Sequence, residues 1–427
     1  MDQKLGLTAE GYSPRVVQMA VRQGSKSASF AEASQDLREL ARVRISARHL
    51  ERLVERVGGE WAQNRDADVA AFREDDLKRQ YAQAPAVSAV MLDGGRVQTR
   101  ADDRPPGVHD PGWKETKVAC CLTLDSAASK EDPQPEPPKK FLDPPRVAKL
   151  VRQIKARGGT TAGGKGEDAR GKKPSPGNAV RNGGTKRRKR RKARVRRLVR
   201  TTVATLADSE AFGWQVGAEV HRRGLDQAGR KACVCDGGRY NWSIFEMHLE
   251  AAGFIGILDF LHLLVYLYAA ARAVMGKGAA QTPEAWALYE RWLRLAWAGK
   301  ASELLTELTR AARKLGAPPK GADEQDPRRV AADAVTYVNN NQERMDYPRY
   351  RKLGLPTSSA PVESLIKQFN RRVKGSEKFW LKGGVEAVLQ VRAAYLRDDD
   401  RTDRYWSRPR PYRRAAGHGT LPRKKVA

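Results

Sequence analysis

The chain has 427 residues, of which 40% are apolar and 30% charged, so it is long and apolar enough for a large core and is not a wholly disordered protein. Its 80 lysines and arginines against 50 aspartates and glutamates give a formal net charge of +30. Such a charge favours a polyanionic partner such as nucleic acid, and the alternative is a basic surface that only meets solvent. The polar opening Met1-Asp2-Gln3-Lys4 predicts no signal peptide.

The first 84 residues have the pattern of short helices. Ser13-Pro14 is typical of a helix start, and we expect Gly24 to close that helix. Ser29-Phe30-Ala31-Glu32 is a capping box for a second helix. Ser46 then caps a third helix, which we expect to end at Gly58-Gly59.

The second and third of these helices, joined by a tight turn, match a helix-turn-helix. Arg48 and Arg52 would lie near the start of its second helix and are our candidate DNA-binding residues there. An ordinary helical hairpin explains the same pattern, and the overall charge favours the DNA-binding interpretation.

Two later stretches repeat the same four letters after an apolar run. Val87–Leu92 is followed by Asp93-Gly94-Gly95-Arg96, and Ala232–Cys235 is followed by Asp236-Gly237-Gly238-Arg239. Each predicts a strand that ends on a carboxylate and breaks into a glycine turn. A lone Asp-Gly is usually only a turn, but the repetition is more specific.

Further strands follow from apolar runs between turn signals. We expect five strands in all, at 86–92, 113–124, 198–206, 231–235 and 254–259, with a helix at 208–223. The order of these elements predicts an α/β protein with an RNase H-like mixed sheet core, a helical N-terminal domain and an all-α insertion before Glu363.

Residues 126–195 are rich in Pro, Gly, Lys and Arg and are expected to be a disordered insert. The insert ends in a basic block, since 11 of the 15 residues from Lys186 to Arg200 are Lys or Arg. Such a block touches phosphate without reading sequence. The candidate DNA-binding residues in it are Lys186, Arg187, Arg188, Lys189, Arg190 and Arg191.

The apolar run from Ala251 to Val274 is interpreted as a buried strand followed by a core helix, and not as a membrane span, because Asp259 and His262 fall in its middle. The four cysteines, Cys120, Cys121, Cys233 and Cys235, lie in apolar strands and are expected to be buried reduced thiols. The tryptophans at 286, 292 and 297 favour core packing, with base stacking as the alternative.

Three acids from separate segments suit metal-dependent phosphoryl transfer on nucleic acid. Asp93 and Asp236 end strands, and Glu363 opens a helical pattern far along the chain. Two Mg²⁺ ions can activate a water or 3′-hydroxyl and stabilise a leaving oxygen, and Mg²⁺ needs only a few carboxylate ligands. We therefore predict Asp93, Asp236 and Glu363 as catalytic and metal-binding residues for two Mg²⁺ ions, with Mn²⁺ as a substitute.

These motifs resemble those of the DDE transposases of bacterial insertion sequences, on the Mutator-like side of that superfamily and close to the Kra-type elements. The resemblance rests on Asp93-Gly94 with a downstream Trp-Lys-Glu-x-Lys strand, on Asp236-Gly237 with Trp242, on Asp259-x-x-His262 and on Val362-Glu363-Ser364. It covers about residues 14–125 and 196–397. The family tends to have Gly-Ser-Gly before its glutamate, whereas this chain has Ser358-Ser359-Ala360-Pro361, which we expect to stiffen the approach to Glu363.

The resemblance implies an enzyme that cleaves the ends of an insertion sequence and transfers the freed strands to target DNA. Its partners would be double-stranded DNA, as terminal inverted repeats and target, and further copies of itself, in the cytoplasm at the nucleoid and not at a membrane. The residues expected to position DNA are Asp259, His262, Arg371, Arg372 and Lys374. Asp259 is also the substitute metal ligand for Asp236, and a buried ion pair with His262 is the alternative role for both.

The resulting domain organisation has seven segments. They are a helical DNA-binding region at 1–84, a first part of the catalytic core at 85–125, the disordered insert at 126–195, a second part of the core at 196–263, a helical insertion at 264–345, a C-terminal part of the core at 346–400 and a basic disordered tail at 401–427. The alternatives to a transposase are a catalytically impaired DNA-binding remnant and a nuclease that cuts DNA without joining it.

Overall fold

The computed structural model describes residues 11–101, 112–158, 195–276, 282–375 and 377–408. The chain divides into two compact units. The first contains Met1–Asp125, Arg196–Asp259 and Leu355–Ala427, and the second contains Ser126–Val195 and Phe260–Gly354. The first unit holds the sheet and the candidate carboxylates, and the regular elements among the described residues of the second unit are all helices.

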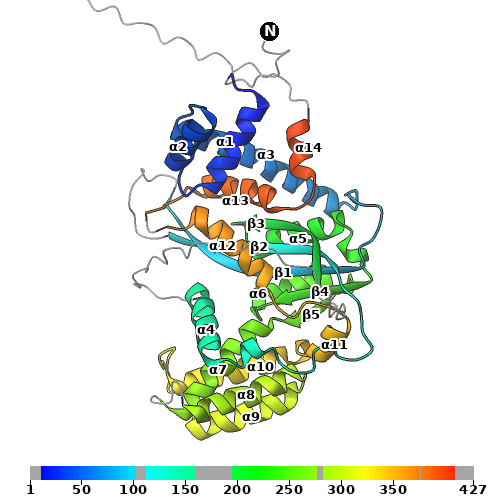
Figure 1. Ribbon diagram of the computed structural model, residues 1–427, viewed down its shortest axis with the longest axis vertical. Helices are drawn as coiled ribbons and strands as arrows, with labels where there is room; N and C mark the ends of the chain where they lie inside the picture. Colours follow the sequence, from blue (N-terminus) through cyan, green and yellow to red (C-terminus); the bar gives the residue numbers. More distant parts are fainter. Residues whose placement is uncertain (1–10, 102–111, 159–194, 277–281, 376, 409–427) are drawn as a thin grey trace, which may run out of the picture. The chain divides into compact units, whose positions relative to one another are not determined.

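The first unit is built on a five-stranded mixed sheet (Figure 1). Its strands are β1 (Val87–Thr99), β2 (Gly112–Asp125), β3 (Arg196–Thr205), β4 (Arg230–Cys235) and β5 (Ile255–Leu258). Their order across the sheet is β3-β2-β1-β4-β5. β1, β4 and β5 run parallel, and β2 is antiparallel to both β1 and β3. The predicted mixed α/β architecture is confirmed.

The predicted glycine turn after Asp93 is wrong. β1 continues through Gly94 and Gly95 to Thr99, and Asp93 pairs with Val118 of β2. The strand continues because β2 is long enough to pair with it along its whole length. The glycines still matter for packing, since a Cβ at Gly95 would lie 2.8 Å from the hydroxyl oxygen of Thr116. β4 does end before Asp236, and Gly237 then takes a positive φ of 90°, as the turn prediction required.

The N-terminal helices are α1 (Pro14–Lys26), α2 (Phe30–Ala41) and α3 (Ala47–Arg73). The three predicted caps are confirmed, because Ser13, Ser29 and Ser46 each accept a hydrogen bond from the first turn that follows. The two predicted helix ends are wrong, since α1 passes through Gly24 and α3 passes through Gly58 and Gly59. Gly58 allows α13 to approach α3 closely, since a Cβ at this position would lie 2.4 Å from the carbonyl oxygen of Ala387.

The remaining helices of the first unit are α5 (Ser209–Arg222), α6 (Arg239–Phe245), α12 (Ala360–Val373), α13 (Lys382–Leu396) and α14 (Arg401–Ser407), with short helical segments η2 (Leu225–Gln227) and η3 (Glu246–Glu250). α12 packs on β1 and β2, α13 packs on β3, and α3 packs on α13 (Figure 1). The predicted disordered tail is therefore wrong for 401–407, which form α14, and residues 409–427 lie outside the described part of the chain.

The second unit contains η1 (Lys139–Phe141), α4 (Pro144–Gly158), α7 (Phe260–Met275), α8 (Pro283–Trp297), α9 (Ala301–Leu315), α10 (Pro327–Asn341), η4 (Gln342–Arg344) and α11 (Tyr347–Lys352). The predicted disorder of the insert is wrong for 126–158. Phe141 is buried against Phe260 and Trp297, and Asp132 forms an ion pair with Arg351. Apolar residues spaced along α4 give the segment a face to pack on α7.

The long apolar run is a strand and a helix, as predicted. β5 ends at Leu258 and α7 begins at Phe260, so the run is split between two elements. In the described ranges, none of the helices has the length and apolar character needed to cross a membrane. Trp292 and Trp297 are buried, which confirms core packing for these two, and all four cysteines are buried free thiols.

Candidate metal centre

Three aspartates lie in one row across three adjacent parallel strands: Asp93 is within β1, and Asp236 and Asp259 come directly after β4 and β5. The register pairs Leu92 of β1 with Cys235 of β4, and Cys235 with Leu258 of β5. The next residue in each segment is Asp93, Asp236 or Asp259. Because neighbouring strands lie about 4.8 Å apart, a shared register places the three backbones in one row. The sequence predicted that Asp93 and Asp236 each end a strand, which is right for Asp236, whereas β1 continues past Asp93.

Local backbone groups orient the first two carboxylates. Asp93 is half-buried and accepts a hydrogen bond of 2.7 Å from the backbone N–H of Gly94. Asp236 is also half-buried, and its Oδ1 accepts bonds of 2.9 Å from both the Gly238 N–H and the Asn241 side chain. Asn241 was not predicted, although an amide five residues after a strand-end aspartate is within reach of the turn it follows.

Asp259 is buried, and hydrogen bonds hold both its backbone and its side chain. Its backbone N–H extends the β4–β5 ladder by donating to the Cys235 carbonyl at 2.7 Å. Its side chain accepts bonds from Ser359, at 3.0 Å from the backbone N–H and at 2.9 Å from the hydroxyl. Ser359 comes immediately before α12, so Asp259 joins the end of β5 to the start of that helix.

Glu363 lies in the first turn of α12 and is 8% exposed. One of its carboxylate oxygens lies within 4.8 Å of one of Asp259. Among the described residues, Asp93 and Asp236 do not form an equally tight group with Glu363. The predicted set of Asp93, Asp236 and Glu363 thus remains a prediction, and Asp259 is an aspartate that the fold brings within metal-binding range of Glu363.

His262 follows Asp259 by three residues. It is half-buried in the first turn of α7 and belongs to the second unit, whose second segment starts at Phe260.

The donor set at this edge fits a divalent cation. Carboxylate oxygens are the ligands that Mg²⁺ and Mn²⁺ prefer, and ligand oxygens at 2.0–2.6 Å from one cation lie no more than about 5 Å apart. The separation of the Asp259 and Glu363 oxygens is within that range. Asp93, Asp236 and Asp259 also lie on or directly after rigid strands, which limits how far their carboxylates must move to share an ion.

The exposed face of α12 is basic. Lys367, Arg371 and Lys374 are all exposed, at spacings of four and three residues that place them on one side of the helix. We call these three residues the α12 stripe. Arg371 and Lys374 were predicted to position DNA, and both are placed where a partner can reach them. Lys367 was not among the predicted DNA-positioning residues, although it lies four residues after Glu363 and four before Arg371, which is a helical spacing.

The prediction that Arg372 positions DNA is wrong. Its side chain is 2% exposed, and its Nε donates to the Gly24 carbonyl at 2.9 Å. The guanidinium carbon lies 4.4 Å from the ring centroid of Phe30 and 4.9 Å from that of Trp380. Burial, and then the charge of Arg392, lower the pKa of Arg372 to about 10. This arginine attaches α1 and α2 to α12 and has no surface left for a phosphate.

The other predicted DNA-binding residues fall into two groups. Arg48 and Arg52 are exposed in the first turns of α3, while Leu50, Leu53 and Val54 on its other face are buried. The amphipathic pattern therefore turns both arginines toward solvent. Residues 186–191 lie outside the described part of the chain.

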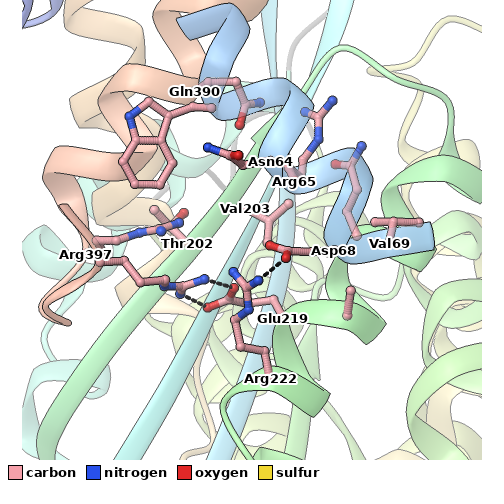
Figure 2. Close-up of a pocket in the computed structure, with 14 residues that line it drawn as sticks. Asn64, Arg65, Asp68, Val69, Thr202, Val203, Glu219, Arg222, Gln390 and Arg397 are labelled. Carbon is pink, nitrogen blue, oxygen red and sulfur yellow. Dashed lines mark hydrogen bonds and ion pairs between the residues drawn. The ribbon is translucent and has the colours of Figure 1, made fainter. Parts of the chain in front are cut away.

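A separate polar cavity of about 60 Å³ lies in the first unit, lined by residues of α3, β3, α5, α13 and α14. Its two acids are already paired: Glu219 with Arg401, and Asp68 with Arg222 (Figure 2). Arg65 and Arg397 also line it. Four guanidinium groups repel a cation, so this cavity is not a second metal site.

The chain matches no protein-family model, and a search of curated proteins finds no match either.

Proposed function

We propose that this chain is a metal-dependent DNA-cleaving and strand-transferring enzyme, a DDE transposase of an insertion sequence built on an RNase H-like core. The observation that carries the proposal is the row formed by Asp93, next to the last residue of β1 that pairs with β4, and by Asp236 and Asp259, directly after β4 and β5. Glu363 lies on α12, which packs on β1, and one of its carboxylate oxygens lies within 4.8 Å of one of Asp259. The strand order and directions are consistent with the RNase H-like core expected from the sequence.

In this proposal the four carboxylates act as two pairs. Asp93 and Asp236 form one pair on neighbouring strands, and Asp259 and Glu363 form the other. The sequence also predicts that His262 positions DNA. Two Mg²⁺ ions, or Mn²⁺, would supply activation of the attacking hydroxyl and charge neutralisation at the leaving oxygen. The protein's own contribution is to hold these carboxylates on the sheet and on α12, with Gly94 orienting Asp93 and with Gly238 and Asn241 orienting Asp236.

The α12 stripe supports a DNA substrate. Lys367 and Arg371 come four and eight residues after Glu363, so the stripe continues along the side of α12 on which Glu363 lies. A phosphate backbone held by the stripe would therefore run past the candidate metal centre. Arg48 and Arg52 on α3 provide a further basic surface on the same unit. Transfer of two element ends requires two active sites, so we propose that the enzyme works as a homo-oligomer on DNA.

The test is strand transfer with DNA that carries the inverted repeats flanking the coding sequence. We expect Asp93→Ala, Asp236→Ala and Glu363→Ala each to reduce Mg²⁺-dependent joining by at least about 10³-fold, because charge stabilisation at the reacting phosphate is lost. DNA binding should persist in all three. Asp125→Ala is the matched control, since this exposed aspartate ends β2 next to the start of β1, at the opposite end of the strands from Asp93.

The outcomes separate the competing functions. Joining at the wild-type rate by any of the three variants would remove that residue from the site. Cutting without joining by the wild-type protein would identify a nuclease. DNA binding without metal-dependent cutting would identify a remnant that has lost its chemistry.

A further inference from the structure

Ser359 is placed at the junction between two catalytic elements. It is buried and immediately precedes α12, and its carbonyl accepts the backbone N–H groups of Val362 at 3.0 Å and Glu363 at 3.2 Å. Ser359 therefore sets the first turn of the helix that carries Glu363. In the sequence, this segment differs from the glycines that are usual in the family that the chain resembles.

The hydroxyl of Ser359 is used in an unusual way for a residue at a helix start. A serine there normally accepts a hydrogen bond from the following turn, which stabilises the helix by roughly 1 kcal/mol. Here the hydroxyl makes no such bond and donates to Asp259 at 2.9 Å, while the backbone N–H donates to the other carboxylate oxygen at 3.0 Å. One residue thus binds both oxygens of the buried aspartate.

We propose that Ser359 is a positioning residue for the metal centre, acting through Asp259. The proposal rests on the function proposed above. By holding both oxygens of Asp259, Ser359 fixes the rotation of that carboxylate and its separation from Glu363, one helical turn further on. Groups that orient a metal ligand by hydrogen bonding change metal affinity or activity by about 10- to 100-fold when they are removed.

The geometry supports this role over simple helix capping. Asp259 and Glu363 are far apart in sequence, and the bonds through Ser359 connect β5 directly to α12. Both Asp259 and Ser359 are buried, so water cannot replace the hydroxyl without rearrangement. If capping were its only use, the hydroxyl would bond to the backbone of α12 itself.

The experiment measures Mn²⁺ binding to the purified full-length protein by the loss of the free Mn²⁺ electron paramagnetic resonance signal. We expect Ser359→Ala to weaken Mn²⁺ binding by about 10- to 100-fold. Ser359→Thr keeps a hydroxyl and should recover most of the affinity. Ser358→Ala is the matched control, because the neighbouring serine makes none of the hydrogen bonds to Asp259, and it should stay within about twofold of wild type.

Ser359→Cys covers the case in which Ser359→Ala fails to fold, since a thiol keeps the volume and is only a weak donor. Thermal unfolding without metal establishes that each variant is folded before titration. Wild-type affinity in Ser359→Ala, or in Ser359→Cys when the alanine variant does not fold, would overturn the positioning role, as would equal weakness in Ser359→Ala and Ser359→Thr. In either case the proposed transposase would stand. A wild-type protein that binds no Mn²⁺ would overturn the metal centre itself, and the positioning role with it.

Discussion

At the scale of single residues, Arg401 and Glu219 form a buried ion pair that closes the first unit. Glu219 is 8% exposed and accepts two hydrogen bonds from the Arg401 guanidinium, at 2.5 and 2.8 Å. Arg401 also donates to Asp399 at 2.6 Å. Since Glu219 is on α5 and Arg401 begins α14, the pair attaches the C-terminal helix to the body of the unit.

Removing one partner should destabilise the protein. We expect Arg401→Ala to lower the free energy of unfolding by about 3–5 kcal/mol at pH 7, because it leaves a buried carboxylate without its counter-charge. Chemical denaturation measures the change. Arg404→Ala is the control, since Arg404 is 53% exposed in its pair with Asp400 and should cost about 0.5 kcal/mol or less.

The same pair makes the stability acid-sensitive. Burial alone would raise the pKa of Glu219, but the charge and hydrogen bonds of Arg401 outweigh it and lower the pKa from 4.5 to about 2. A carboxyl with a lowered folded-state pKa contributes stability above its unfolded pKa, so this contribution should be lost as the pH falls from about 4.5 toward 2. Arg401→Ala should show a weaker fall over that range, and an unchanged fall would contradict the assignment to this pair.

At the scale of elements, the contact between α3 and α13 depends on one glycine. We expect Gly58→Ala to destabilise the protein by about 1–3 kcal/mol, because the added Cβ would lie 2.4 Å from the Ala387 carbonyl oxygen and force the helices apart. Thermal unfolding measures the effect.

Gly59 is the matched control for that prediction. It lies next to Gly58 in α3, and a Cβ there would meet nothing within 4 Å. Gly59→Ala should therefore stabilise the protein by about 0.5–1 kcal/mol through helix propensity alone. Equal effects at the two positions would show that the close approach of α13 does not matter.

At the scale of the whole molecule, the charge of +30 should make DNA binding steeply dependent on salt. The structure assigns part of that charge to the α12 stripe. We expect the triple variant Lys367→Gln, Arg371→Gln, Lys374→Gln to reduce the slope of log K against log[salt] by about 2.7, which is roughly 0.9 for each lost phosphate contact. Fluorescence anisotropy with labelled duplex DNA measures the slope.

The control for the stripe removes the same charge elsewhere. Arg56, Arg196 and Arg404 are each in an ion pair with an acid at the surface of the first unit. Because these charges are already offset locally, replacing all three with Gln should change the slope by less than about 1. Equal loss in both triple variants would mean that only the total charge matters.

Sequence patterns predicted the elements better than their ends. Alternation and apolar runs located all five strands, because those patterns are local. The helix and strand ends predicted at Gly24, Gly58 and Gly94 were wrong, because at these positions the absence of a Cβ allows a neighbouring segment to approach closely and does not end the element. The prediction of disorder for residues 126–158 was wrong because the prolines and charges of this segment outnumber the few apolar residues, such as Phe141, that pack within the second unit.

By itself, the sequence determined the mixed α/β class, the helix caps, the cysteines' burial and the candidate acids at Asp93, Asp236 and Glu363, because each depends on residue type and local spacing. Only the tertiary structure decided that Asp259 lies beside Glu363, that Ser359 holds Asp259, and that Arg372 is buried while Lys367 is exposed. These facts depend on which segments pack together across a hundred residues or more, and a local pattern carries no record of that.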